Sequence, residues 1–227
     1  MSEVQLHHGD CLQILPTLEA GSVDCIVTDP PYNRINRNTG GLREIDKGGA
    51  DSDPVNIDAV SKEFARLTRH SVVVFCGDTQ FSEWVNAFNS LGMTTRIGVW
   101  HKTNPSPMNG TKLYLSALEL CVIARKEGAY FNGHCLHPIW TGISERVFRF
   151  PCPKPVWLME AIIDVVVPPN GTVLDPYLGS GTTGVAAVKS GKTFIGIELK
   201  KAYYRLASNR IEVEQIRESQ MAMEMVS

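Results

Sequence analysis

Residues 171–200 limit the fold more than any other stretch of this chain. Residues 172–175 and 193–198 are short apolar runs that predict buried strands, and residues 184–190 between them predict a helix. A glycine-rich turn joins the first strand to the helix. A strand, a glycine turn, a helix and a second strand that ends in an acid form a nucleoside-binding βαβ unit. We therefore expect an α/β protein built around a mostly parallel sheet.

The glycine-rich turn is the first candidate ligand site. It reads Asp-Pro-Tyr-Leu-Gly-Ser-Gly-Thr-Thr over residues 175–183 and matches only part of the dinucleotide fingerprint GxGxxG. Asp175 would repel a pyrophosphate but attract an amino group or a sulfonium. Glu198, at the end of the second strand, can accept hydrogen bonds from two ribose hydroxyls. These features together describe a site for S-adenosylmethionine, and the alternative is an ordinary α/β turn.

Asp29-Pro30-Pro31-Tyr32 is the second candidate site. It follows a buried strand predicted at 24–28, and the two prolines end that strand because each lacks an N–H and has a fixed φ. The Asp29 carboxylate and a proline-locked carbonyl provide two acceptors, which suit the two N–H donors of a planar exocyclic amine. Tyr32 offers a stacking face for a flat base. The alternative is a strand-to-loop turn, for which Asp-Pro-Pro is a common composition.

The remaining pattern predicts a single domain over residues 1–217 and a frayed tail at 218–227. A length of 227 residues suits one α/β domain with insertions. Asp10 is expected to cap a short helix that contains Pro16. Further helices are predicted at 57–68, 80–91, 155–167 and 201–217, and further strands at 4–6, 71–77, 95–102 and 118–125. The strands at 95–102 and 118–125 are expected to form an antiparallel hairpin at one edge of the sheet.

Two segments interrupt this alternation. Residues 33–56 are rich in Asn and Gly and predict a mobile loop that leaves the tetrad and closes over a substrate or contacts phosphates; the alternative is a solvated linker. Residues 127–150 interleave aromatic with basic side chains, which is typical of a recognition insertion. A small satellite core is the alternative for this second segment.

The composition excludes several classes of protein. The chain is 43% hydrophobic and 20% charged, as in globular proteins, and it has no apolar run of about 20 residues that could span a bilayer. The N-terminal residues do not resemble a signal peptide, so a cytoplasmic location is expected. The six cysteines lack CxxC spacing and are expected to be reduced, and we expect no metal site. The net charge of −2 leaves room for a local basic face that binds nucleic acid.

The two motifs together resemble the amino-group DNA methyltransferases. Asp-Pro-Pro-Tyr at 29–32 precedes the glycine turn at 175–183, and this order is similar to the β group of the family, a circular permutation of the shared fold. Gly9-Asp10-Cys11, the segment from Trp100 to Pro105 and Lys154-Pro155 also match the family. Phe150-Pro151-Cys152-Pro153 departs from it, because many members have a His-Pro start there.

The resemblance implies a Rossmann-like methyltransferase fold with a seven-stranded sheet, S-adenosylmethionine as cofactor, and double-stranded DNA as partner. It also implies a role for each motif residue. The catalytic residues would be Asp29, Pro30, Pro31 and Tyr32. The cofactor-binding residues would be Asp10, Cys11, Asp29, Lys154, Pro155, Asp175, Tyr177, Gly179, Ser180, Gly181, Thr182, Thr183 and Glu198. Basic side chains assigned to DNA are Arg34, Arg37, Arg43, Lys102, Arg146 and Arg149. Members of the β group are often dimers, so a homodimer is also expected.

We therefore expect an enzyme that methylates N6 of an adenine flipped out of DNA. N4-cytosine methylation is the nearest alternative because that amine has the same geometry, although such relatives more often begin the tetrad with Ser. A catalytically silent DNA-binding regulator is a second alternative. Methylation of RNA or of a protein amide is a third, although such enzymes more often begin the tetrad with Asn.

Overall fold

The computed structural model describes residues 2–32, 55–107, 110–112, 114–145, 147, 150 and 152–224. Most of the mobile loop predicted at 33–56 lies outside these residues. The same is true of five basic residues that were assigned to DNA, so their role stays a prediction: Arg34, Arg37, Arg43, Arg146 and Arg149.

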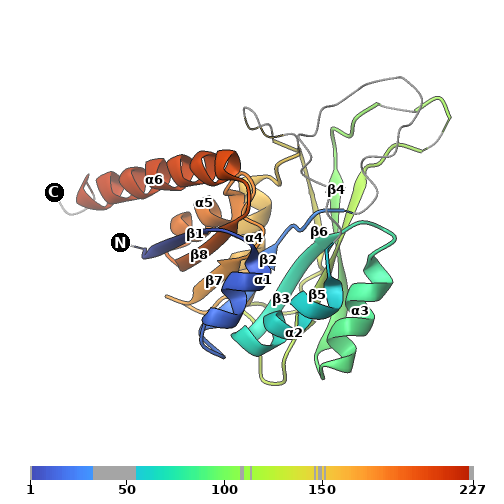
Figure 1. Cartoon of the computed structure of the whole chain (residues 1–227). Coiled ribbons are helices and arrows are strands. Elements are labelled where there is room, and N and C mark those ends of the chain that lie inside the picture. Colours follow the sequence, from blue (N-terminus) through green and yellow to red (C-terminus); the bar gives the residue numbers. More distant parts are fainter. Residues whose placement is uncertain are drawn as a thin grey trace.

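Within the described residues, eight strands form one sheet in which a single strand runs antiparallel (Figure 1). The strands are β1 (Val4–His8), β2 (Val23–Thr28), β3 (Thr68–Cys76), β4 (Thr94–Lys102), β5 (Leu118–Arg125), β6 (Ile139–Gly142), β7 (Thr172–Asp175) and β8 (Thr193–Glu198). Their order is β1-β8-β7-β2-β3-β5-β4-β6. β5 is antiparallel to β3 and β4, and the other neighbouring pairs are parallel. The expected α/β fold with one antiparallel hairpin is confirmed.

The sheet has one strand more than the seven expected, and this strand lies outside the hairpin. β6 comes from the segment predicted as an insertion and pairs parallel with β4, whose backbone groups would otherwise face water. Gly98 in β4 makes this pairing compact: a Cβ there would lie 2.9 Å from a ring carbon of Trp140. Because β6 has only four residues, the alternation of its side chains is too short to predict a strand.

Helices cover both faces of the sheet, and this explains why the central strands direct apolar side chains toward both faces. α1 (Cys11–Ile14), the 3-10 helix η1 (Leu15–Thr17), α2 (Ile57–Leu67) and α3 (Phe81–Ser90) pack on one face. α4 (Val156–Val166), α5 (Thr182–Lys189) and α6 (Lys201–Glu224) pack on the other. Side chains alternate between these two cores: Ile26 contributes to the first, and Cys25 and Val27 to the second. All six residues of β2 are buried.

The C-terminal helix corrects the expected frayed tail, because α6 continues to Glu224. The sequence from 197 to 224 contains no glycine or proline that would end a helix. Gln215 Nε2 also donates a hydrogen bond to the carbonyl of Ser2, at 3.0 Å, and ties this part of the helix to the start of the chain. Neither α6 nor any other helix in the described ranges is long and apolar enough to cross a membrane.

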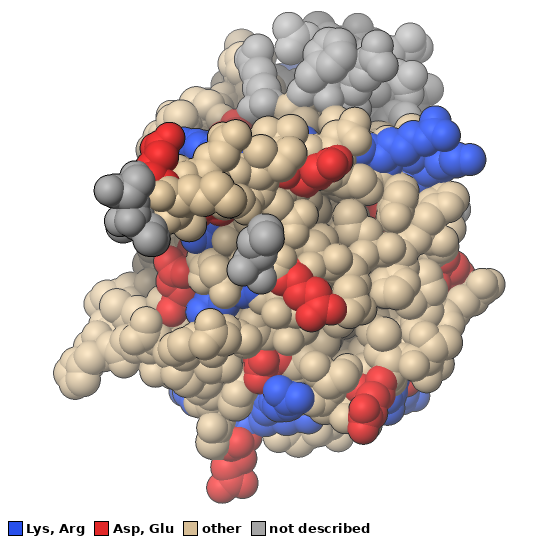
Figure 2. Space-filling view, turned by 90° about the vertical axis from the view of Figure 1, so that its left-hand side faces the viewer, with Lys and Arg blue, Asp and Glu red and all other residues tan. Residues whose placement is uncertain are grey.

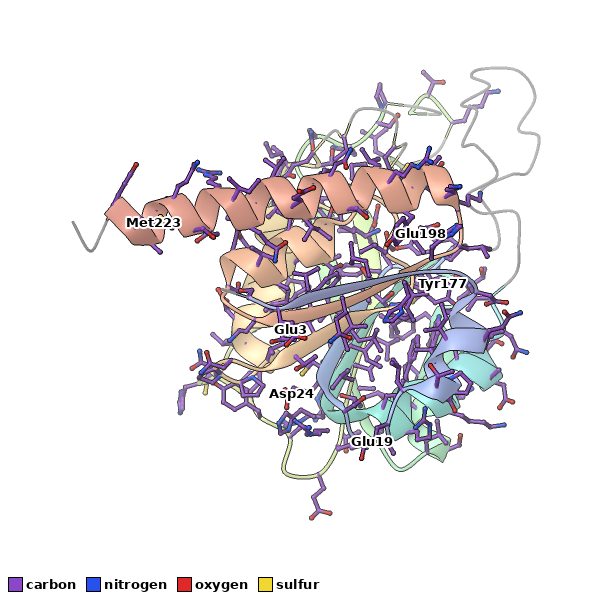
Figure 3. The ribbon with its side chains drawn as sticks, turned by 60° about the vertical axis from the view of Figure 1, so that its left-hand side comes forward. Glu3, Glu19, Asp24, Tyr177, Glu198 and Met223 are labelled. Carbon is purple, nitrogen blue, oxygen red and sulfur yellow. The ribbon has the colours of Figure 1, made fainter. Side chains whose placement is uncertain are left out.

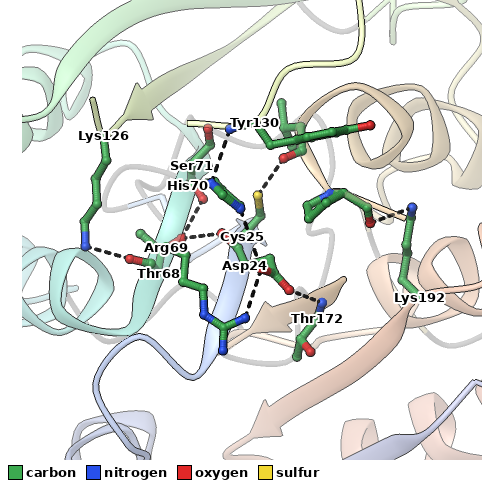
Figure 4. Close-up of polar contacts among 12 residues, drawn as sticks. Asp24, Cys25, Thr68, Arg69, His70, Ser71, Lys126, Tyr130, Thr172 and Lys192 are labelled. Atoms are coloured by element: carbon green, nitrogen blue, oxygen red, sulfur yellow. Dashed lines mark hydrogen bonds and ion pairs between the residues drawn. The ribbon is translucent and has the colours of Figure 1, made fainter. Parts of the chain in front are cut away.

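β2, which leads into the tetrad, is fixed at its start by a polar cluster around Asp24 (Figure 4). The Asp24 carboxylate accepts hydrogen bonds from Arg69 Nη1, at 3.1 Å, and from the backbone N–H of Thr172, at 2.7 Å. The Thr68 hydroxyl donates to the carbonyl of Asp24 at 2.8 Å. These bonds join the first residues of β2, β3 and β7. The register of β2 is therefore set at the end of the strand opposite the candidate site.

Candidate functional site

Parallel pairing of β2 with β7 brings the tetrad and the glycine turn together. Cys25 pairs with Val173 and Ile26 with Leu174, so both strands end at the same edge of the sheet. Thr28, the last residue of β2, donates a hydrogen bond from its hydroxyl to the Asp175 carboxylate at 2.7 Å. Asp29 follows Thr28 directly, and Asp175 begins the turn. Thr28 and Asp175 are 147 positions apart in the chain, yet one hydrogen bond connects the ends of their strands.

The glycine turn requires glycine at Gly179 and Gly181. Both residues have positive φ angles, +53° and +80°, which residues with a Cβ rarely adopt. A Cβ on Gly181 would lie 2.9 Å from Cα of Ala207 in α6, and a Cβ on Gly179 would lie 2.9 Å from the Phe150 ring. The turn therefore packs closely against its neighbours and directs the chain into α5.

Two buried acids flank the turn. Asp175 is 2% exposed and accepts a second hydrogen bond from the backbone N–H of Tyr177 at 3.1 Å. Burial raises the pKa of Asp175 to about 6. The hydrogen bonds from Thr28 and Thr183 favour the charged form and oppose this rise. Glu198 accepts from the N–H groups of Gly179, at 2.8 Å, and Lys200, at 2.7 Å, and burial raises its pKa.

The predicted residues after β1 lie at the same edge of the sheet. Asp10 caps α1 by accepting a hydrogen bond from the N–H of Leu12 at 2.9 Å, as expected. Cys11 is buried and shares a hydrogen bond with the Tyr177 hydroxyl; burial raises the pKa of the thiol. Figure 3 shows Tyr177 and Glu198 close together at one end of the sheet, with Asp24 at the other end.

Hydroxyl groups line the start of α5. The hydroxyls of Ser180 and Thr182 are 3.1 Å apart and hydrogen-bonded, and both residues are buried. Arg210 of α6 donates from Nη1 to the Ser180 carbonyl at 2.5 Å and to the Thr182 hydroxyl at 3.4 Å. The sequence did not single out Arg210, because a basic residue in a long polar helix has no local feature that distinguishes it.

At the tetrad, the Asp29 carboxylate forms an ion pair with Lys154. Lys154 Nζ lies 2.5 Å from one carboxylate oxygen, and the Tyr32 hydroxyl donates to the other at 2.9 Å. Lys154 is 6% exposed and immediately precedes Pro155, the residue before α4. Burial raises the pKa of Asp29, and the neighbouring ammonium opposes that rise. Lys154, assigned to the cofactor by resemblance, thus contacts the predicted catalytic carboxylate.

The ion pair continues into the sheet through two residues with different predicted roles. Glu119 of β5 lies 2.9 Å from Lys154 Nζ with one oxygen and 2.9 Å from Lys102 Nζ with the other. Lys102 was assigned to DNA, but its side chain is only 16% exposed and holds Glu119; contact with phosphates stays a prediction. Glu119 is the second residue of the strand predicted at 118–125, and no role is predicted for it from the sequence. An isolated acid in an otherwise apolar strand is the signal that points to it.

Gln80, which the sequence did not identify as part of the site, contacts the tetrad from the position just before α3. Its side chain is 3% exposed. Nε2 donates to the carbonyl of Pro31 at 3.4 Å, and Oε1 accepts from the N–H of Gly77 at 3.3 Å. Gly77 follows β3, so this side chain links the ends of two adjacent strands. Its position just before α3 made it appear to be an ordinary helix-start residue.

The described surface carries charges of both signs. On the face shown in Figure 2, acidic and basic side chains are interspersed. This distribution agrees with the small net charge of −2. Among the described residues, no group of three or more His, Cys, Asp or Glu side chains is placed to hold a metal ion.

Comparison with known proteins identifies the family. The N6/N4 DNA methylase family model matches residues 23–209. The chain is 31% identical to the type II methyltransferase M2.DpnII of Streptococcus pneumoniae, over 92% of this chain and 90% of that one. It is also 31% identical to the type II methyltransferase M2.LlaDCHI of Lactococcus lactis subsp. cremoris, over 91% of this chain and 88% of the relative.

Two solved structures share the fold. M1.HpyAVI, solved as a complex with S-adenosylmethionine, has a TM-score of 0.72 and 28% identity, over 92% of this chain and 99% of that one. The cytosine-N4-specific PvuII DNA methyltransferase also has a TM-score of 0.72, with 16% identity, over 92% of this chain and 86% of the other. Given the family match and the adjacent tetrad and glycine turn, this chain belongs to the N6/N4 family of S-adenosylmethionine-dependent DNA methyltransferases.

Proposed function

We propose that this protein methylates N6 of an adenine that has been flipped out of DNA. The observation that carries the proposal is the position of Asp29, which follows β2 at the point where Thr28 is hydrogen-bonded to Asp175 of the cofactor turn. A target amine held by Asp29 would therefore lie beside the residues assigned to the cofactor. Flipping is required because an amine inside a base pair is inaccessible, and it costs a few kcal/mol.

The two acceptors of the tetrad explain how a weak nucleophile reacts. The N6 lone pair is delocalised into the adenine ring. Asp29 accepts one N–H, and the carbonyl of Pro30, a buried residue with a fixed φ, accepts the other. Both bonds draw the nitrogen toward tetrahedral geometry and free its lone pair. The Asp29 charge stabilises the positive charge that develops on the nitrogen.

Tyr32 is proposed to support the base on one side. Its hydroxyl donates a hydrogen bond to the Asp29 carboxylate, and its ring centroid lies 5.3 Å from Lys154 Nζ. These contacts fix the ring next to the carboxylate, and a flat base could stack on a ring held in this way. Stacking and hydrogen bonding would together hold the amine in line for transfer.

The residues of the turn suit S-adenosylmethionine, which supplies an electrophilic methyl group when bound. Asp175 offers a carboxylate for a cationic or amino-bearing ligand. Glu198 is oriented by the N–H groups of Gly179 and Lys200, and it is proposed to hold the ribose hydroxyls. Gly179 and Gly181 allow a ligand to approach the backbone closely, and Asp10 and Cys11 are proposed to lie near the adenine of the cofactor.

The buried Asp175 predicts opposite effects of pH on stability and on cofactor binding. Its folded pKa of about 6 exceeds the ordinary value of 3.8, so the charged carboxylate destabilises the cofactor-free fold. This destabilisation is absent below about pH 4 and complete above about pH 6. Asp175→Asn should therefore raise the free energy of unfolding at pH 7 by about 1–3 kcal/mol. The same change should weaken cofactor binding.

Denaturant titrations at pH 5 and pH 7 test the stability, and calorimetry tests the binding of S-adenosylmethionine. In the unsubstituted protein, cofactor affinity should fall as the pH drops below about 6, because the carboxylate becomes protonated. Asp58→Asn, at a side chain that is 77% exposed, is the control. An Asp175→Asn variant that is less stable at pH 7, or that binds the cofactor normally, would contradict this assignment.

Adenine is proposed over cytosine because the tetrad begins with Asp. The nearest alternative, N4-cytosine methylation, uses an amine of the same geometry, and the PvuII enzyme shares the fold. We expect N6-methyladenine when DNA methylated by the purified protein is digested to nucleosides and analysed by mass spectrometry. N4-methylcytosine instead would refute the adenine assignment. The absence of any methylated nucleoside would favour a catalytically silent regulator.

A further inference from the structure

Four charged residues of alternating sign extend from the tetrad into the sheet. Asp29 lies 2.5 Å from Lys154, and Glu119 lies 2.9 Å from both Lys154 and Lys102. The four side chains are between 6% and 26% exposed, so solvent screens them little. Ions at such depth are stable only when they are paired, because each loses its hydration. The four charged side chains therefore have to be considered as one unit.

Lys154 has two opposing effects on the proposed chemistry. Its ammonium favours the ionised form of the half-buried Asp29, which has to be a carboxylate to accept the N–H of an amine. The same positive charge opposes the positive charge that develops on that amine during methyl transfer. A second carboxylate that faces Lys154 would offset this opposition without removing the ammonium. Glu119 is the carboxylate in that place.

We propose that Glu119 is a positioning residue that acts on Asp29 through Lys154. It holds the ammonium between two carboxylates and offsets its charge, so that Asp29 presents net negative charge to the target amine. This inference rests on the proposed function, because it assigns a role in the same site. It adds a residue from β5, which lies two strands away from β2 in the sheet.

The other charged and titratable groups near Asp29 are consistent with this balance. The groups that interact with Asp29 or with Glu119 are Tyr32 and three residues that end strands: Cys76 in β3, Lys102 in β4 and Asp175 in β7. Burial disfavours the charged form of Glu119, but the ammonium groups of Lys154 and Lys102 outweigh it and lower the pKa of Glu119 to about 2. Glu119 is therefore ionised throughout the working pH range, and its negative charge raises the pKa of Asp29.

Glu119→Gln tests the role of the charge, because glutamine keeps the size and an acceptor oxygen. We expect kcat to fall about tenfold, with unchanged KM for DNA and unchanged cofactor affinity. The acid limb of the pH profile of kcat should move to lower pH, because Asp29 loses a negative neighbour. The carboxyl titration of Asp29, followed by carbon NMR in the protein without ligand, should move in the same direction.

The direction of this shift separates charge balance from a merely structural role. If Glu119 only anchors Lys154, its loss would free the ammonium, and the Asp29 titration would move to higher pH, as is expected for Lys154→Met. An upward shift or no shift would overturn the inference. Glu160→Gln, which removes the carboxylate partner of Lys189 between α4 and α5, is the matched control and should change neither property. If the unsubstituted protein lacks activity, the proposed function fails, whereas the NMR titration still decides the inference.

Discussion

Asp29→Ala is expected to lower the rate of methyl transfer by about 10³-fold or more while S-adenosylmethionine still binds. The substitution removes the proposed acceptor for the target amine and the negative charge proposed to stabilise the reacting nitrogen. It also leaves the Lys154 ammonium facing the developing positive charge. Lys154 keeps Glu119 as its partner, at 2.9 Å, so the variant should fold.

Single-turnover transfer of a labelled methyl group to DNA measures the rate, and calorimetry measures cofactor binding. Asp58→Ala is the control, because that side chain is 77% exposed on α2. Thermal unfolding of both variants checks that the fold is retained. If Asp29→Ala kept more than about a tenth of the activity, the assigned role of the carboxylate would be wrong.

Gly181→Ala is expected to lose both stability and cofactor affinity. The φ of +80° is strained for alanine, and the new Cβ would lie 2.9 Å from Cα of Ala207, a backbone atom that cannot rotate away. Left-handed strain and overpacking together should lower the free energy of unfolding by about 2–4 kcal/mol. Because the turn has to shift away from α6, affinity for S-adenosylmethionine should fall roughly tenfold or more.

Gly191→Ala separates the effect of left-handed backbone strain from the effect of the contact with Ala207. Gly191 has a similar φ of +66°, but a Cβ there would have no atom within 4 Å, apart from its chain neighbours. This control should lose only about 1 kcal/mol from backbone strain and should bind the cofactor normally. Denaturant titrations and calorimetry of the two variants give the comparison. Equal losses in both would show that the contact with Ala207 is unimportant.

The regular elements could be predicted closely because their signals are local. The expected helix at 57–68 is α2 at Ile57–Leu67, and the expected strand at 193–198 is β8. Apolar runs, a glycine turn and Asp10 at a helix start depend on neighbours within a few residues. The tail predicted at 218–227 was expected to fray because chain termini commonly do, whereas α6 continues to Glu224.

The tetrad and the glycine turn were also readable from the sequence, because each lies within at most nine consecutive residues. What joins them was not readable: Thr28 to Asp175, Lys154 to Asp29 and Glu119, and Gln80 to Pro31 are contacts between strands or loops distant in the chain. The eighth strand is a similar case, since β6 is defined by its pairing with β4.

The amino-acid sequence by itself determined the α/β class, the two motifs and the chemistry that each can support. Only the tertiary structure decided that the tetrad carboxylate is held by a buried ammonium and that a second acid faces that ammonium from β5. Local propensity acts over a few residues, but the charge state of a buried group depends on whichever side chains the folded sheet brings within a few ångströms of it.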